Sequence, residues 1–455
     1  MPFETAAQAE DFIFSSYMAV ESRLSGPDAE TRSPELARQL LDAVGEPDAT
    51  FTSIVVAGSK GKGSIAFLTS KLLESFGYRV GLVTSPHLVN FRERIRFNGR
   101  AIPPEDFVRL VNRVEGPARE IIASLPEGRY LSPAGIILAV ASLYFAEQDA
   151  EFAVVEAGRG GQYDDSVVLD NPLVLFGPIL LEHPAQLGGT LAEIAATKAA
   201  LLKSGGVGVS APQEPEVLDV MVGWSYQVGG GLVVTGRDVQ VINPRIVGDK
   251  LHVSVQARYN LFEDFTLAIP ALYEATNLAV ALSAFEIVRD EQELQMDEKE
   301  ILREAMANLK FPGRMQTLSE SPFTLLDGAI ARSSAQSVLE SLSQDGRLLR
   351  PLTAIVGVPA DKDWKGVLWE LSSVCDHLIL TGVRNPRLKF AGAEAVEFAR
   401  SIFPASTVIE EAGGIAEARA MLGKSAQLPA TTLILGTQSL LADTLRDYNF
   451  DLEQI

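Results

Sequence analysis

The chain is poor in the residues that build disulfide frameworks, metal clusters and nucleic-acid surfaces. Among its 455 residues there are one cysteine, Cys375, and four histidines. A single cysteine excludes an internal disulfide framework and a cysteine-based zinc site, and it is compatible with a reducing compartment. Basic residues are also scarce, because 39 Lys and Arg stand against 59 Asp and Glu, a net charge of −20. This acidic excess argues against generic binding to nucleic acid or to an anionic membrane.

Long hydrophobic runs are missing as well, and we expect no leader segment. The longest apolar stretch, residues 133–146, is shorter than the roughly 18 residues that indicate a membrane span. The first residues are acidic and lack the basic and apolar regions of a secretory signal. We therefore expect a cytoplasmic protein with no membrane or nucleic-acid partner. A hydrophobic fraction of 47% is too high for a disordered chain, and the length predicts more than one domain.

Strand-like and helix-like segments alternate along most of the chain. Residues 51–57 are β-branched and apolar and stop at a glycine, which is typical of a buried parallel strand. Apolar residues at helical spacing follow over residues 65–76, and residues 79–84 have a strand pattern again, so a βαβ unit is predicted. A further helix is predicted at residues 275–287. Further strands are predicted at residues 152–157, 172–177, 324–326, 353–358, 377–380 and 431–435.

The pattern changes between residues 207 and 269. Apolar and polar residues alternate over residues 233–255, which Gly-Asp and Asn-Pro pairs interrupt, so we predict a small antiparallel subsheet there. A Pro-Gly pair at residues 312–313 precedes a fresh strand-helix alternation. We predict an α/β fold in which residues 1–308 form a P-loop domain with a mainly parallel sheet, and residues 309–455 form a smaller Rossmann-like α/β domain.

A glycine-rich turn between the first predicted strand and helix carries the strongest chemical signal. Its sequence is Gly58-Ser59-Lys60-Gly61-Lys62-Gly63-Ser64. Glycines at a helix N-terminus let backbone N–H groups approach phosphate oxygens, while Lys62 can reach a terminal phosphate and Ser64 can bind Mg²⁺. The run departs from a strict Walker A motif, since Val56 takes the place of the first glycine and Gly63 separates Lys62 from Ser64. The alternative interpretation is a strand-helix turn that binds no ligand.

Several motifs in one order resemble the Mur-ligase superfamily, and within it the folylpolyglutamate and dihydrofolate synthases. The resemblance runs from about residue 35 to the end of the chain. Its motifs are at residues 58–64, 85–95, 155–161, 187–199, 312–314, 327–329, 360–363 and 385–387. The resemblance implies that ATP phosphorylates a carboxylate to an acyl phosphate, which an amino group then attacks to give an amide. The implied substrates are small molecules, namely ATP, a folate-like carboxylate and glutamate, and we expect the chain to act as a monomer.

The resemblance also implies roles for individual residues. Those that match ATP contacts are Gly58, Ser59, Lys60, Gly61, Lys62, Gly63, Ser64, Asn277, Arg314 and Asp327. Those that match Mg²⁺ ligands are Ser64, Ser85, Glu156 and His183. The implied catalytic residues are Lys62, Lys198 and His183, and Lys198 stands where the family carries a lysine carbamylated by CO₂. The candidates for substrate binding are His87, Arg92 and Arg94.

Each of these residues also has a plainer interpretation. Glu156 could be a surface carboxylate, His183 a core histidine and Lys198 a solvated helical lysine. The arginines at positions 92, 94, 96 and 100 could form a nucleic-acid patch, but they are isolated in an acidic protein. We interpret them as substrate-carboxylate binding residues or as plain surface.

Departures from the family pattern concentrate at the acceptor and amino-acid contacts. Ile330 and Ala331 replace the histidine and asparagine of a D-G-A-H-N-P motif, residues 162–167 replace R-L-D-A-T-N, and Arg92 replaces an asparagine. Three hypotheses follow. The chain is a folate-type ligase with rebuilt glutamate contacts, a Mur-type ligase for another carboxylate and amine, or an ATP-binding protein without ligase activity. The length of the matching order favours the first, and retention of the phosphate and metal residues argues against the third.

Overall fold

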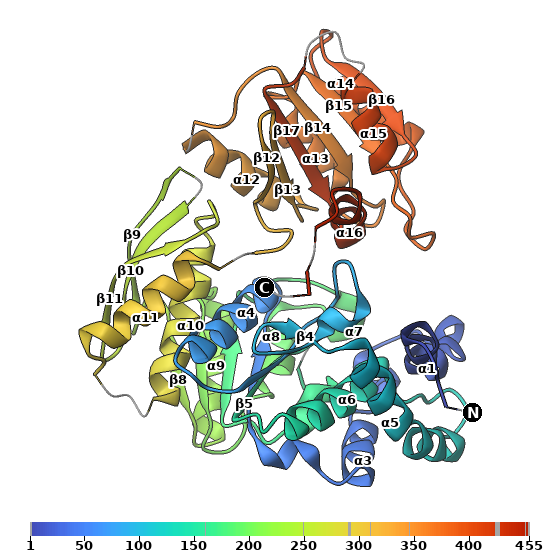
Figure 1. The fold of residues 1–455 in the computed structure, drawn as a ribbon, viewed down its shortest axis with the longest axis vertical. Helices are drawn as coiled ribbons and strands as arrows, with labels where there is room; N and C mark the ends of the chain where they lie inside the picture. Colours follow the sequence, from blue (N-terminus) through green and yellow to red (C-terminus); the bar gives the residue numbers. More distant parts are fainter. Residues whose placement is uncertain are drawn as a thin grey trace.

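The protein is described by a computed structural model that covers residues 2–159, 161–248, 250–289, 293–309, 311–344, 346–423, 428–450 and 452–453. Its strands form three sheets of eight, three and six strands. Figure 1 shows the eight-stranded and three-stranded sheets in the lower part of the molecule and the six-stranded sheet in the upper part. The predicted fold class, a P-loop domain with a mainly parallel sheet and a second α/β sheet behind it, is confirmed.

The eight-stranded sheet has the order β4-β3-β2-β5-β1-β6-β7-β8 and is parallel except for β3 and β4 at one edge. Its parallel strands are β1 (Thr52–Ala57), β2 (Val80–Val83), β5 (Phe152–Glu156), β6 (Leu173–Phe176), β7 (Val207–Ser210) and β8 (Gly231–Val234). The edge strands are β3 (Ile95–Phe97) and β4 (Arg100–Ala101). The expected strand, helix and strand at residues 51–84 are therefore β1, α4 (Lys62–Ser75) and β2.

Helices cover both faces of this sheet. The side chains of β1 point alternately to the two faces, so they pack in two separate hydrophobic cores. Ile54 and Val56 pack in one core with α4 and with α10 (Glu274–Val288). Val55 and Ala57 pack in the other. The helices of that second face are α1 (Ala6–Met18), α3 (Glu35–Ala43), α5 (Pro104–Ser124), α6 (Pro133–Glu147), α8 (Leu191–Ala199) and α9 (Pro215–Gln227).

The apolar stretch of the sequence is helix α6, and its side chains are buried in the second core. Among the described residues, no helix combines the length and the hydropathy that a membrane crossing requires. The other helices of this part are α2 (Asp28–Thr31), α7 (Pro184–Leu187) and α11 (Met296–Ala307). Short 3₁₀ helices are η1 (Glu21–Arg23), η2 (Pro47–Thr50), η3 (Phe91–Arg94) and η4 (Asp165–Val168).

The antiparallel subsheet is smaller than the sequence pattern predicts. It consists of β9 (Gln240–Val247), β10 (Lys250–Gln256) and β11 (Leu261–Leu267), whereas β7 and β8, which lie in the same predicted region, join the parallel sheet. The prediction of an Asn-Pro turn is also wrong. Asn243 and Pro244 lie inside β9, where the register with β10 shifts and Asn243 has a φ of 48°. Because β9 is an edge strand, a proline within it breaks no inner ladder.

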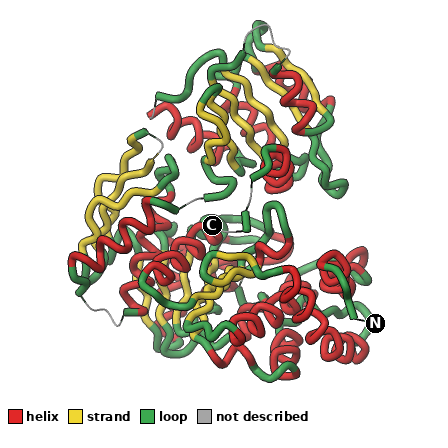
Figure 2. The backbone as a smooth tube through the Cα atoms, viewed as in Figure 1, coloured by secondary structure: helices red, strands yellow, loops and turns green. Residues whose placement is uncertain are grey.

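The six-stranded sheet has the order β12-β13-β17-β14-β15-β16 and is parallel apart from β12. Its strands are β12 (Gln316–Glu320), β13 (Phe323–Asp327), β14 (Leu352–Gly357), β15 (His377–Thr381), β16 (Val408–Ala412) and β17 (Thr431–Gly436). Its helices are α12 (Arg332–Gln344), α13 (Trp364–Leu371), α14 (Ala393–Ile402), α15 (Ile415–Leu422) and α16 (Gln438–Asp447). In Figure 2 these helices flank the strands. The domain boundary after residue 308 stays a prediction.

Candidate active site

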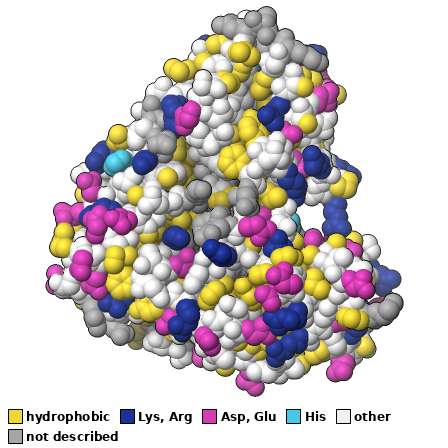
Figure 3. All heavy atoms as spheres, in the orientation of Figure 1, with side chains coloured by type: hydrophobic (Ala, Val, Ile, Leu, Met, Phe, Trp, Pro, Cys, Tyr) yellow, Lys and Arg dark blue, Asp and Glu magenta, His cyan; other side chains and the backbone are white. Residues whose placement is uncertain are grey.

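A cleft of about 1330 Å³ lies between the two parts of the molecule. Figure 3 shows the surface hollowed between the upper and lower parts, with Lys and Arg side chains beside the opening. The lower part contributes the phosphate loop, the segment after β2 and the start of α10, and the upper part contributes residues that follow β13, β14, β15 and β17. Ligands of α/β proteins commonly bind outside the carboxyl ends of parallel strands, and this cleft is in that position for both large sheets.

The predicted phosphate loop joins β1 to α4 and lines the cleft with Lys60, Gly61, Gly63 and Ser64. Gly61 has a φ of 76°, and a Cβ atom there would lie 2.7 Å from Oδ1 of Asn277. A larger residue at this position would therefore be strained and would collide with α10. The Nζ atom of Lys62 donates a hydrogen bond to the carbonyl oxygen of Gly58 at 3.2 Å, so the lysine folds back over the loop.

The first turn of α10 holds the end of this loop. The Oγ atom of Ser64 donates a hydrogen bond to Oε1 of Glu274 at 2.7 Å, and Nδ2 of Asn277 donates to Oε2 of the same carboxylate at 2.9 Å. Glu274 is 0% exposed, and its burial raises its pKa while Asn277 and Ser64 oppose that shift. The sequence predicts Ser64 and Asn277 but not Glu274, whose only signal is its place directly before a predicted helix.

Glu156 and Ser85 meet beside the phosphate loop. Glu156 ends β5, and its Oε2 atom accepts a hydrogen bond from the backbone N–H of Ser85 at 2.9 Å. A Cβ atom on Gly63 would lie 3.7 Å from both carboxylate oxygens, so Glu156 faces the start of α4. Desolvation raises the pKa of Glu156, and the charge of Lys62 opposes this. The carboxylate of Glu156 and the hydroxyl of Ser64 are hard oxygen donors, and these residues fit Mg²⁺.

His183 is the other predicted Mg²⁺ ligand. It precedes α7 with a φ of 48°, and like Ser85 and Glu156 it is not among the described residues that line the cleft. Burial lowers its pKa, so the ring is neutral at physiological pH, as a metal ligand must be. The described part of the chain has no cluster of three or more His, Cys, Asp or Glu side chains at metal-binding spacing. A metal at this site would therefore depend on hydroxyl oxygens and phosphate in addition to carboxylate.

Lys198 is 0% exposed, so the interpretation as a solvated lysine is wrong. It lies on α8, and its Nζ atom donates to the carbonyl oxygens of Gly58 at 3.1 Å and Arg159 at 3.0 Å. It also forms an ion pair with Glu182 at 3.2 Å. Burial lowers the pKa of Lys198, and Glu182 opposes that shift. Three oxygen acceptors around one nitrogen suit the unmodified amine, and they tie α8 to the phosphate loop.

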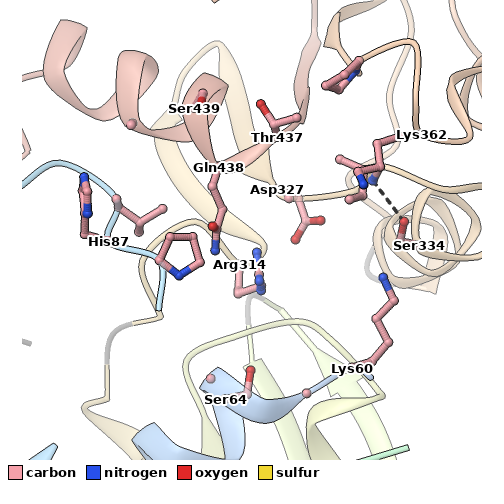
Figure 4. A pocket seen from close by; sticks show the side chains of 18 of the residues that line it. Lys60, Ser64, His87, Arg314, Asp327, Ser334, Lys362, Thr437, Gln438 and Ser439 are labelled. Atoms are coloured by element: carbon pink, nitrogen blue, oxygen red, sulfur yellow. Dashed lines mark hydrogen bonds between the residues drawn. The ribbon is translucent and has the colours of Figure 1, made fainter. Parts of the chain in front are cut away.

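Arg314 and Asp327 bring the upper part of the molecule to the cleft (Figure 4). Asp327 ends β13, and its Oδ2 atom accepts a hydrogen bond from the backbone N–H of Met315 at 2.9 Å. A Cβ atom on Gly328 would lie 2.3 Å from Nη1 of Arg314, so the guanidinium packs on that glycine. Burial raises the pKa of Asp327 and the charge of Arg314 opposes this. In Figure 4 both side chains lie across the cleft from Lys60 and Ser64.

Among the three candidates for substrate binding, His87 and Arg94 line the cleft. Nε of Arg94 donates a hydrogen bond to Nδ1 of His87 at 3.1 Å. Burial and then the charge of Arg94 lower the pKa of His87 to about 4, so the ring is neutral and carries its proton on Nε2. The pair therefore presents hydrogen-bond donors, which suits a carboxylate.

Arg92 does not line the cleft. Its Nη1 atom donates to the carbonyl oxygen of Ile102 at 2.6 Å, and its guanidinium pairs with the carboxylate of Glu453. Arg96 is also buried, and its Nη2 atom donates to the carbonyl oxygen of Leu452 at 2.8 Å. The interpretation of the arginine run as surface is therefore wrong for Arg92 and Arg96, both of which hold the C-terminal tail.

The segment that departs from the family pattern also reaches the cleft. Ile330 lines it, and the backbone N–H groups of Ile330 and Ala331 donate to Oγ of Ser334 at 3.2 and 3.1 Å. Three serines of α12, at positions 333, 334 and 337, line the same wall together with Lys362. The sequence motifs do not indicate these serines. Of the third motif, Gly160 lies outside the described residues.

Comparison with known proteins identifies relatives over most of the chain. No protein-family model matches it. It is 28% identical over 387 residues to a dihydrofolate synthase/folylpolyglutamate synthase of Mycobacterium tuberculosis, covering 82% of this chain and 79% of the relative. It is 28% identical over 385 residues to the protein of the same name in Bacillus subtilis, covering 83% and 88%. The solved folylpolyglutamate synthase of Thermotoga maritima matches with a TM-score of 0.78 and 26% identity over 96% of each chain. The chain is a homologue of the folylpolyglutamate and dihydrofolate synthases, which are members of the Mur-ligase superfamily.

Proposed function

We propose that the chain is an ATP-dependent ligase that joins glutamate to a folate or dihydropteroate carboxylate through an acyl phosphate. The observation that carries this proposal is that one cleft unites the phosphate loop with Arg314 and Asp327. Named relatives support it, and a solved folylpolyglutamate synthase of Mycobacterium tuberculosis, with a TM-score of 0.84, is described in complex with ADP and AMPPCP. Another structural neighbour is described as an AMPPCP and folate complex.

The nucleotide would lie across the cleft and contact both parts of the molecule. Lys62 and the N–H groups of residues 61–64 would hold the β- and γ-phosphates. Arg314 would pair with a phosphate, and Asp327 would accept hydrogen bonds from ribose hydroxyls. Asn277 would bind adenine through its amide. Because these groups come from both sides of the cleft, bound ATP favours its closed form.

Mg²⁺ belongs to the proposal because ATP chemistry leaves several negative charges to neutralise. Ser64, Ser85, Glu156 and His183 are the residues that would hold it. When bound, the ion shares the phosphate charge with the loop. Carboxylate and hydroxyl oxygens dominate this set, and such ligands favour Mg²⁺ over softer metals.

The reaction needs two displacements at the cleft. An oxygen of the substrate carboxylate attacks the γ-phosphorus and ADP leaves with the electrons of the broken P–O bond. The glutamate nitrogen then attacks the acyl carbon, loses a proton and expels phosphate. His87 and Arg94 would orient the carboxylate through donated hydrogen bonds, and the phosphate loop would stabilise the transferred group.

Carbamylation of Lys198 remains a prediction within this proposal. Its burial and lowered pKa support it, since CO₂ reacts with the neutral amine. The present contacts with Gly58, Arg159 and Glu182 suit the free amine, so a carbamate requires Glu182 to turn away. Addition of bicarbonate to CO₂-depleted enzyme would raise its activity, and an activity independent of bicarbonate would contradict the carbamate.

A second candidate function has one observation in its favour. Ile330 lines the cleft where the family carries a polar residue, and an apolar side chain cannot bind the polar groups of glutamate. This favours a Mur-type ligase that uses another carboxylate or amine. Mass spectrometry of products from a panel of carboxylate and amine pairs separates the two. A folate product heavier by one glutamyl residue supports the first function, and product only from another pair supports the second.

The working form of the enzyme is part of the same proposal. We expect a monomer in the cytoplasm. What supports the monomer is that described residues of one chain line the cleft from both sides. What supports the cytoplasm is that the cysteine, Cys375, is a buried free thiol, which is compatible with a reducing compartment. Light scattering of the purified chain with nucleotide tests the first expectation.

A further inference from the structure

Glu274 joins two residues that the proposed function places on the nucleotide. Its Oε1 atom accepts from Ser64 at 2.7 Å and its Oε2 atom accepts from Asn277 at 2.9 Å, so both oxygens are used. The carboxylate comes from α10, 210 residues beyond Ser64 in the chain. Neither partner can turn away without leaving a carboxylate oxygen unsatisfied in a site that is 0% exposed.

These bonds decide which atoms of the two partners face the ligand. A serine hydroxyl has one proton, and Ser64 gives it to Glu274, so the lone pairs of its Oγ atom remain for a cation. Asn277 likewise donates a hydrogen bond from Nδ2 to Glu274, and its Oδ1 atom therefore faces the phosphate loop at Gly61. A carboxylate that accepts a hydrogen bond from a metal ligand also raises the basicity of that ligand.

We propose that Glu274 is a positioning residue that orients Ser64 as a ligand of Mg²⁺ and Asn277 as an acceptor toward the nucleotide. The inference rests on the proposed function, since it needs a nucleotide and Mg²⁺ in the cleft. Glu274 does not itself line the cleft and acts through Ser64 and Asn277.

The same helix provides a matched control. Glu286 is also on α10 and is buried, with an exposed fraction of 3%. Its carboxylate accepts backbone hydrogen bonds from Arg258 at 3.1 Å, Tyr259 at 3.2 Å and Asn260 at 2.7 Å, so it holds the loop before β11 rather than the phosphate loop. A variant of Glu286 perturbs α10 to a similar degree without touching Ser64.

The test measures binding of the non-hydrolysable nucleotide AMPPCP to the full chain by calorimetry, with and without Mg²⁺. We expect Glu274→Ala and Ser64→Ala each to reduce the gain in affinity from Mg²⁺ by about tenfold. The double variant should lose no more of the Mg²⁺ gain than Ser64→Ala alone, because Glu274 acts on Mg²⁺ through Ser64 and on the nucleotide through Asn277. Glu274→Gln keeps a carbonyl acceptor for Ser64, so it should retain most of the gain in AMPPCP affinity from Mg²⁺. Glu286→Gln should retain the whole of this gain.

Three outcomes contradict this account. The positioning role is overturned if Mg²⁺ increases the affinity of Glu274→Ala for AMPPCP as much as it does for the wild type. It is also overturned if the fold-losses of the two single variants multiply in the double variant. If Glu274→Ala does not fold, Glu274→Met, which keeps the length without an acceptor, takes its place. Absence of AMPPCP binding in the wild-type chain would overturn the proposed function itself, and the inference with it.

Discussion

Arg92 and Glu453 are bound to each other through both carboxylate oxygens, at 2.5 and 3.2 Å, although 361 residues separate them in the chain. The backbone N–H of Ala101 also donates to the carbonyl oxygen of Glu453 at 2.9 Å. Leu452 and Glu453, which follow α16 in the chain, contact β3 and β4 in the lower part of the molecule. The tail therefore ties the two parts together beside the wall of the cleft that carries His87 and Arg94.

Removal of this tie should lower stability. Glu453→Ala leaves the buried guanidinium of Arg92 without its carboxylate, and we expect a loss of about 1 kcal/mol, reduced because Glu453 is half exposed. Urea denaturation measures the change. Glu127→Ala is the control, since Glu127 pairs with Arg23 fully at the surface and its loss should cost almost nothing. Equal effects of the two variants would show that the tail is not held by this pair.

Glu156 is expected to be indispensable for turnover. Glu156→Ala removes the partly buried carboxylate between Ser85 and the phosphate loop, and we predict a decrease in Mg²⁺-dependent ATP turnover of about 100-fold or more. Glu216→Ala, at an exposed position on α9, should leave turnover unchanged. Turnover that survives in Glu156→Ala with the same Mg²⁺ dependence would remove Glu156 from the metal site.

Ile330 should affect binding of the amine substrate and not binding of the nucleotide. Ile330→Asp places a carboxylate on the wall near α12, and we expect the KM for glutamate to rise by about tenfold or more through like-charge repulsion. The KM for ATP should stay within about twofold, because Ile330 is not among the residues that match ATP contacts. Ile301→Asp on the exposed side of α11 controls for added surface charge. A change in the KM for ATP alone would place Ile330 at the nucleotide.

Asp165 predicts a pH dependence of stability. Burial and then the nearby charge of Asp164 raise the pKa of Asp165 from 3.8 to about 7, so the folded chain keeps a proton that the unfolded chain loses. Its contribution is therefore favourable below about pH 4 and is lost as the pH rises toward 7.

The variant Asp165→Asn should remove this dependence. We expect the decrease in the free energy of unfolding between pH 4 and pH 7 to be smaller in Asp165→Asn than in the wild type, by up to about 1.4 kcal/mol per pH unit. Urea denaturation at several pH values measures the difference. Asp219→Asn, at an exposed position on α9, should follow the wild type. Parallel pH profiles for Asp165→Asn and the wild type would mean that Asp165 is ionised when folded.

The parts of the fold that follow from local pattern were predictable. β1, the phosphate loop and α4 show buried-strand, glycine-turn and helical periodicity in succession, and the structure has them in that order. β7 and β8 were misassigned because their neighbours alternate apolar and polar residues, and pairing with β6 is decided at long range. Asn243 and Pro244 indicate a turn locally, but the pairing of β9 with β10 accommodates them as a bulge.

The site was predictable only where residues belong to motifs. Ser64 and Asn277 stand in such segments, whereas Glu274 gains its meaning from a contact with Ser64 that no spacing in the sequence reveals. Arg92 was misplaced for a related reason. Arg94, two residues further on, lines the cleft, whereas Arg92 pairs with Glu453 at the far end of the chain. Long-range pairings of this kind follow from the tertiary fold rather than from periodicity or composition.

Release of phosphate from ATP, with each component omitted in turn, tests the central proposal most directly. The complete mixture holds the purified chain, ATP, Mg²⁺, glutamate and either dihydropteroate or tetrahydrofolate. The account predicts that phosphate release requires all of these components and that omission of the pterin substrate or of glutamate stops it. Phosphate release at the same rate without them, or none in the complete mixture, would contradict the assignment as a folate-type ligase.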